Sequence, residues 1–112
     1  MRNNKQIRVS SELQLIDALK KMDDLQCKLL IVMDGDKFKS VVSIGDIQRA
    51  IIKKVSLESS IQSILRENIS ISSSGDSIEK IKKRIFELRA ECMPVVDDEN
   101  HLTAVYFWED FF

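Results

Sequence analysis

Few side chains in this 112-residue sequence are of the types that catalyse reactions. The single histidine, His101, lies in a polar stretch between two apolar runs, which predicts a solvated hairpin turn. Cys27 and Cys92 are far apart and each adjoins an apolar run, so we expect two buried thiols, with a disulfide or redox role as the alternative. These residues are too few for a zinc site or a Cys/His nucleophilic pair. The sequence therefore predicts a chain that is not itself an enzyme and holds no metal.

Known cation and phosphate loops are also absent from the sequence. The Asp-Gly-Asp segment at residues 34–36 is like the start of a calcium loop, but the glutamate required at loop position 12 would fall on Gly45. The sequence contains neither a GxGxxG segment nor a P-loop. A phosphate or calcium ligand would have to be bound in another way.

The polar residues best placed to bind a ligand are Ser43 and Asp46, which precede an apolar stretch. A hydroxyl and the free backbone N–H groups at a helix start favour an anion. The same Ser-x-x-Asp spacing approximates a capping box, which stabilises a helix without any ligand. Both interpretations stay open. Arg49, one turn further along, either reaches a phosphate or is a solvated helix residue.

Charge and hydropathy exclude two classes of partner. With 17 basic and 18 acidic residues the net charge is −1, which is unlike the basic surface of a nucleic-acid-binding protein. The longest apolar run, residues 29–33, is far shorter than the roughly 20 residues that span a bilayer. The first residues lack the apolar core of a secretory signal. We therefore expect a cytoplasmic protein that binds neither nucleic acid nor a membrane.

The elements that position these residues occur twice along the chain. Apolar residues at helical spacing predict helices over residues 12–26 and 76–89, the second capped by Ser74 or Asp76. The predicted buried faces consist of Leu15, Ala18, Leu19 and Met22, and of Ile78, Ile81, Ile85 and Leu88. Each helix is followed by an apolar strand, an acidic turn and a second strand, and each is preceded by a short strand at residues 7–10 or 69–72.

The predicted repeats cover residues 1–56 and 57–112. The first ends in a helix from Ser43 to about Lys54, whereas the second stops after residues 108–112, where the final helix is truncated or a longer chain would continue. Residues 56–66, between these helical and strand patterns, predict a short helix. One repeat of this length has a small core, so pairing two repeats is the expected way to bury enough apolar surface.

This duplicated βαββα unit resembles the CBS domain, named for cystathionine β-synthase, and its tandem form resembles the CBS pair, or Bateman module. The resemblance is carried by Ser-Ile-Gly-Asp at residues 43–46 and Met-Pro-Val-Val-Asp at residues 93–97, each in register within its repeat. It implies an α+β, sandwich-like fold in which two repeats pack as a pseudo-two-fold pair. Residues 45–51 are also similar to CBS pairs fused to sugar-phosphate nucleotidylyltransferase domains.

The resemblance implies a regulatory module, without a cofactor, that binds AMP, ADP, ATP or S-adenosylmethionine and controls an attached domain. In that pattern Ser43 contacts phosphate and the Asp46 carboxylate accepts hydrogen bonds from the ribose hydroxyls. The implied ligand-binding residues are Ser43, Gly45 and Asp46, together with the apolar Ile7, Val9, Ile31 and Val42, which would enclose the base.

The second repeat departs from this pattern. Aligning Asp110 with Asp46 places Phe107 where Ser43 stands, and a phenylalanine ring cannot hydrogen-bond phosphate. Glu109 adds a negative charge beside it. We therefore expect a weaker second site at Asp110 and Val95, and one bound nucleotide at most.

Aromatic residues are concentrated at the end of the sequence. Five of the seven lie in the last seven residues: Tyr106, Phe107, Trp108, Phe111 and Phe112. They either cap the core of the second repeat or form an interface with a second copy or a missing downstream catalytic domain. We expect a homodimer. The alternative function is a structural dimerisation module whose ligand clefts are empty.

Overall fold

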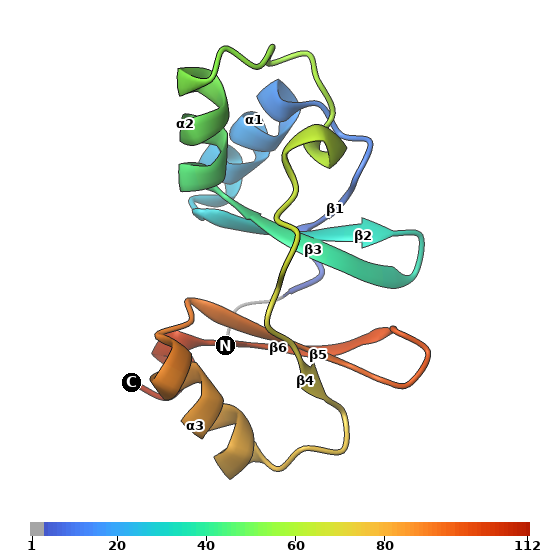
Figure 1. Cartoon of the computed structure of the whole chain (residues 1–112), viewed down its shortest axis with the longest axis vertical. Coiled ribbons are helices and arrows are strands. Elements are labelled where there is room, and N and C mark those ends of the chain that lie inside the picture. Colours follow the sequence, from blue (N-terminus) through green and yellow to red (C-terminus); the bar gives the residue numbers. More distant parts are fainter. Residues whose placement is uncertain (1–3) are drawn as a thin grey trace. The chain divides into compact units, whose positions relative to one another are not determined.

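The structure is a computed structural model that describes residues 4–112 (Figure 1). Its contacts group the described chain into two compact units. The N-terminal unit is built on residues 4–35 and Lys39–Ile69, and the C-terminal unit is centred on Ser70–Phe112. Within residues 4–112 there are three α-helices and two three-stranded sheets, which confirms the predicted mixed α+β class.

Each unit contains the predicted succession of strand, helix, strand, turn and strand. The elements of the N-terminal unit are β1 (Arg8–Ser10), α1 (Leu15–Leu25), β2 (Leu29–Asp34), β3 (Lys37–Ser43), α2 (Ile44–Ile52) and the 3-10 helix η1 (Ile61–Ile64). The elements of the C-terminal unit are β4 (Ser72–Ser73), α3 (Ile78–Leu88), β5 (Cys92–Val96), β6 (Leu102–Phe107) and the 3-10 helix η2 (Trp108–Asp110).

The N-terminal sheet has the strand order β1-β2-β3, with β1 parallel to β2. Helices α1 and α2 both lie on one face of this sheet (Figure 1). Their buried side chains are Leu15, Ala18 and Met22 of α1 and Ile47 and Ala50 of α2. The periodic apolar residues therefore form the predicted core. Because Ile47 and Ala50 face this core, the opposite face of α2 remains accessible to solvent.

Helix α1 begins three residues later than predicted. The backbone N–H of Leu13 donates to the carbonyl of Ser10 at 3.1 Å, which closes a turn, and Gln14 is extended. Leu19, predicted to be buried, is only half-buried. The apolar spacing begins at Leu15 and does not fix the first residue of the helix, which the turn at Ser10–Leu13 decides.

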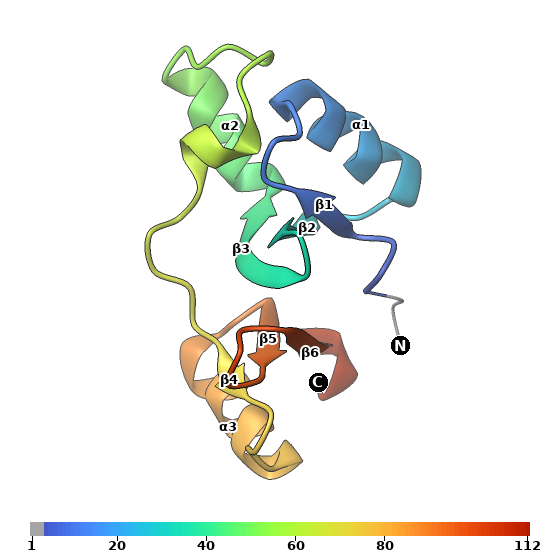
Figure 2. The same ribbon diagram turned by 90° about the vertical axis from the view of Figure 1, so that its right-hand side faces the viewer.

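The segment after α2 folds back onto the same unit (Figure 2). The backbone N–H of Leu15 donates to the carbonyl of Ser59 at 2.9 Å, and that of Ile61 donates to the carbonyl of Leu13 at 2.8 Å. The Ile61 side chain is fully buried. The predicted short helix is confirmed as η1, and the division of the sequence repeats at residues 56 and 57 stays a prediction.

In the C-terminal unit, β5 is the central strand, parallel to β4 and antiparallel to β6. Helix α3 covers one face of this sheet and buries Ile81 and Ile85 (Figure 1). The other two residues predicted for that face, Ile78 and Leu88, are 48% and 51% exposed, so this part of the prediction was wrong. In the described part of the C-terminal unit, the short 3-10 helix η2 stands where α2 stands in the other unit. Helix α3 therefore has no second α-helix beside it there, and only the middle of its own apolar stripe is buried.

The cap of α3 also differs from the prediction. Ser77 is the N-cap, and its hydroxyl accepts the backbone N–H of Lys80 at 3.2 Å. Asp76 instead accepts the backbone N–H of Ser73 at 3.0 Å and pairs with the Lys80 ammonium at 3.0 Å. These hydrogen bonds, chiefly the one from Ser73, hold the pKa of Asp76 below its usual value. Several neighbouring residues here are suited to capping, and backbone conformation decides which one does so.

The internal duplication extends to the backbone. Helices α1 and α3 both end at a left-handed residue, Gln26 and Arg89, each with φ of 53°. The first residue of α2 donates its N–H to the carbonyl of Lys28 at 2.9 Å, and Trp108 of η2 donates to the carbonyl of Glu91 at 3.0 Å. Matching local geometry at matching places supports the two-repeat interpretation of the sequence.

Two expectations about single residues need correction. Cys27 is buried as predicted, but Cys92 is only half-buried, and no disulfide joins them. His101 is not simply a solvated turn residue, because its Nδ1 lies 3.2 Å from a carboxylate oxygen of Asp97 and its backbone N–H donates to the other oxygen at 2.8 Å. Asp97, in the same turn, thus holds His101 by hydrogen bonds to its backbone and its ring. The backbone N–H of His101 is also the main cause of a lowered pKa of Asp97.

Two negative findings hold for residues 4–112. None of the helices there has the length and apolar character needed to cross a membrane. In the same part of the chain, no three histidine, cysteine or acidic side chains gather as a metal-binding group.

Candidate functional site at the head of helix α2

Ser43 and Asp46 are held together at the start of α2. The backbone N–H of Asp46 donates to the Ser43 hydroxyl at 3.2 Å, and the backbone N–H of Ser43 donates to the Asp46 carboxylate at 2.8 Å. Ser43 is extended and ends β3, so the sheet sets the position of the cap. The predicted capping box is therefore confirmed. Contact of the same two side chains with a ligand stays a prediction.

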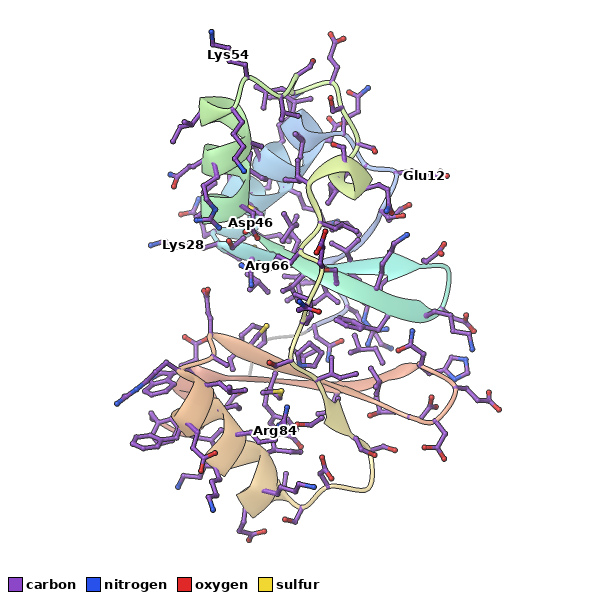
Figure 3. The ribbon with its side chains drawn as sticks, viewed as in Figure 1. Glu12, Lys28, Asp46, Lys54, Arg66 and Arg84 are labelled. Atoms are coloured by element: carbon purple, nitrogen blue, oxygen red, sulfur yellow. The ribbon has the colours of Figure 1, made fainter. Side chains whose placement is uncertain are left out.

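Two arginines converge on this cap, and Figure 3 shows one of them, Arg66, beside Asp46. The Arg66 Nε lies 3.2 and 3.1 Å from the two carboxylate oxygens of Asp46, and its Nη2 donates to the Ser43 hydroxyl at 3.2 Å. Arg49 donates to Asp46 at 2.6 Å while its side chain remains 63% exposed. Arg49 is thus both solvent-accessible and paired, a combination that neither sequence interpretation contained.

Sequence reasoning did not identify Arg66. It lies 20 residues after Asp46, in the segment that follows η1, and no helical or strand spacing relates the two. The turn that returns η1 to the helices brings it to the cap. A basic residue at the end of the predicted linker helix, residues 56–66, was the only available signal in the sequence, and this signal is not specific.

Asp46 is charged in this environment. Burial of its side chain, which is 8% exposed, would raise its pKa, but the Ser43 N–H and the guanidinium groups of Arg66 and Arg49 outweigh burial and hold the pKa below its usual value. The site therefore contains one carboxylate and two permanent cations at neutral pH.

A cavity of about 210 Å³ lies beside the cap. It is lined by residues of α2, the following turn and η1: Asp46, Arg49, Ala50, Lys53, Val55, Ser63 and Ile64. The charged groups along this wall are one acid and two bases. Because the two cations outnumber the one anion, the wall favours an anionic group in the cavity.

The remaining residues implied by the resemblance occupy two kinds of environment. Gly45 lies within the cap, where an added Cβ would be 3.5 Å from the Arg49 guanidinium, an ordinary contact. The apolar set is deep in the core and does not line the cavity beside Asp46; it comprises Ile7, Val9, Ile31 and Val42. Contact of these four side chains with a base stays a prediction.

Solved structures of the same architecture are known. OpuCA of Staphylococcus aureus has a TM-score of 0.79 at 20% identity, covering 93% of this chain and 86% of that one. The CBS domain pair of protein MJ0100, in complex with 5'-methylthioadenosine and S-adenosyl-L-methionine, has a TM-score of 0.76 at 19% identity, covering 93% and 82%. The CBS domain protein PAE2072 of Pyrobaculum aerophilum, complexed with AMP, has a TM-score of 0.75 at 16% identity, covering 98% and 89%. The chain has the fold of a CBS domain pair. No family model matches its sequence, and neither does any curated protein.

The second half of this CBS-type fold repeats the backbone of the cap without its hydroxyl. The backbone N–H of Phe107 donates to the Asp110 carboxylate at 2.7 Å, as that of Ser43 does to Asp46, which confirms the alignment of the two positions. The Phe107 ring is buried, and so is Val95. A cavity of about 310 Å³ adjoins Phe107 and is lined by Arg89, Ala90, Glu91, Phe107, Trp108 and Glu109, but not by Val95 or Asp110. Two acids and one base make it a poorer place for an anion than the cavity beside Asp46.

The aromatic residues at the end of the CBS-type fold pack on one another and on α3. The Trp108 and Phe112 ring centroids are 4.5 Å apart, and those of Tyr106 and Phe111 are 5.6 Å apart. Tyr106, Trp108 and Phe111 contact the core of the C-terminal unit, which confirms for them the predicted capping role. Phe112 is 51% exposed, so an interface role stays open for it.

Proposed function

We propose that the chain is a regulatory module that binds an adenine nucleotide beside Ser43 and Asp46 and controls an attached domain. The observation that carries the proposal is the convergence of a hydroxyl, a buried carboxylate and two guanidinium groups at the head of α2, where a cavity begins that runs along the helix. Solved structures with this fold, those of MJ0100 and PAE2072, hold adenosine-containing ligands.

The chemistry of the cap suits such a ligand. A carboxylate kept ionised accepts hydrogen bonds from a pair of ribose hydroxyls. The Ser43 hydroxyl, the start of α2 and the cationic side chains of Arg49 and Lys53 suit a phosphate. Residues 45–51 make a sugar-phosphate nucleotidylyltransferase our choice for the attached domain, and the protein would then be cytoplasmic. The chain would regulate that enzyme without catalysing a reaction itself.

A thermal-shift panel tests this function. AMP, ADP, ATP, S-adenosylmethionine and sugar nucleotides are each added to the whole chain. A ligand that binds only the folded state adds about 2.7 kcal/mol of stability at 100 times its Kd, so at least one adenine nucleotide should raise Tm and the sugar nucleotides should not. If no adenine ligand raises Tm at millimolar concentration, the sensing function is wrong.

The competing function is a structural dimerisation module with empty clefts. It is favoured by the aromatic side chains of Phe86 and Phe112, which are 48% and 51% exposed and whose ring centroids are 5.7 Å apart. Exposed aromatic pairs are typical of interfaces.

Both functions are compatible with a homodimer, which we expect to form through the CBS pair. Sedimentation equilibrium should give a mass of twice the 12.9 kDa of one chain. Phe112→Ser should shift the species toward monomer, because it removes apolar surface from the proposed interface. Ile52→Ser, at an exposed apolar position on α2, is the matched control and should leave the mass unchanged. A monomer across a wide concentration range would refute dimerisation.

A further inference from the structure

Arg66 occupies the acceptors that the proposed nucleotide needs. Its guanidinium reaches both carboxylate oxygens of Asp46 and the Ser43 hydroxyl, with all three distances between 3.1 and 3.2 Å. The carboxylate also accepts the Ser43 N–H at 2.8 Å and Arg49 at 2.6 Å. The single hydrogen of the Arg66 Nε is shared between the two oxygens, so three N–H groups make four contacts with a carboxylate that offers about four acceptor positions. A ribose therefore has to compete with Arg66 for Asp46.

We propose that Arg66 is an internal competitor that closes the empty site, and that ribose displaces it from Asp46 so that its guanidinium pairs with the phosphate of the same ligand. The inference rests on the proposed function, since it concerns how that site selects its nucleotide. It assigns the ligand to the phosphorylated adenine nucleotides and disfavours both the neutral nucleoside and the cationic sulfonium of S-adenosylmethionine.

The Arg66 side chain is exposed enough to move away from the cap. It is 42% exposed, whereas that of Asp46 is 8% exposed, so the arginine can leave the cap without unfolding the core. The Ser43 N–H and Arg49 still compensate the carboxylate after Arg66 has left.

Charge balance explains why phosphate must follow the ribose. The cap and its cavity wall contain the cations of Arg49, Lys53 and Arg66 and the single anion of Asp46. A neutral nucleoside that displaces Arg66 breaks its ion pair with Asp46 and replaces it with hydrogen bonds from uncharged hydroxyls, which leaves the guanidinium without a counter-charge. A nucleotide supplies a phosphate, which a guanidinium binds through two parallel hydrogen bonds.

The test compares adenosine and AMP by calorimetry in the wild-type chain and in Arg66→Gln. Wild type should bind AMP at least about tenfold more tightly than adenosine, the scale of one charge-assisted contact. In Arg66→Gln, adenosine should bind more tightly because Asp46 is released, and AMP should bind more weakly because a phosphate partner is lost. The AMP-to-adenosine affinity ratio should therefore fall about tenfold or more. Lys20→Gln, which removes one exposed positive charge from α1, is the control and should keep the wild-type ratio.

The opposite signs for the two ligands separate this inference from simple structural support. If Arg66→Gln weakens adenosine and AMP by the same factor, Arg66 only supports the cap and the inference is wrong, although nucleotide binding stands. If S-adenosylmethionine binds wild type more tightly than AMP does, the assigned ligand class is wrong. If neither adenosine nor AMP binds wild type, this inference is wrong, and the thermal-shift panel with the other adenine ligands decides whether the proposed function stands.

Discussion

Asp46→Ala is expected to weaken AMP binding by about 1.5–3 kcal/mol, the scale of a hydrogen bond to a charged group. The substitution removes the ionised carboxylate that would accept the ribose hydroxyls, and no other acidic side chain lines the cavity beside it. Isothermal calorimetry with the whole chain measures the loss directly.

Asp110→Ala is the matched control for this experiment. Asp110 makes the same backbone contact to Phe107 that Asp46 makes to Ser43, so both substitutions remove one N-terminal hydrogen bond. Only Asp46 has a hydroxyl and two guanidinium groups beside it. Affinity in Asp110→Ala should stay within experimental error of wild type. Equal losses would mean that both halves bind nucleotide, and a loss in Asp110→Ala alone would mean that the site lies in the C-terminal unit.

A second substitution distinguishes lost chemistry from a lost helix start. Asp46→Asn keeps an oxygen that can accept the Ser43 N–H but carries no charge. It should stay folded and still bind AMP more weakly than wild type. Wild-type affinity in Asp46→Asn would show that the carboxylate charge makes no contribution to binding.

The largest expected effect on stability is that of Ile47→Ala. Ile47 is fully buried on α2 between Asp46 and the rest of the helix, and truncating such a side chain leaves a cavity that costs about 2–5 kcal/mol. Urea unfolding should show a lower midpoint at unchanged slope.

Ile52→Ala on the same helix is the control for this measurement. Ile52 is 78% exposed, so its truncation should change the unfolding free energy by no more than about 0.5 kcal/mol. Similar losses in both variants would mean that α2 buries a different face. Because Asp46 precedes Ile47 directly, Ile47→Ala should also weaken nucleotide binding through loss of the rigid helix start.

The duplicated succession of helices and strands could be predicted from the sequence because its signals are local. Helical spacing located α1 and α3, acidic turns marked both hairpins, and Ser-x-x-Asp placed the reciprocal cap of Ser43 and Asp46. The same register predicted that Phe107 replaces Ser43, and the backbone contact of Asp110 confirms that equivalence. Each of these features depends on residues only a few positions apart.

The tertiary structure alone decided the features that depend on distant neighbours. Arg66 joins Asp46 only because η1 returns to the helices, and no spacing in the sequence encodes that return. Ile78 and Leu88 have the same apolar character as Ile81 and Ile85, yet they are exposed because a single helix covers their sheet. Burial and ion pairing depend on what packs against a residue, whereas periodicity describes only the element that contains it.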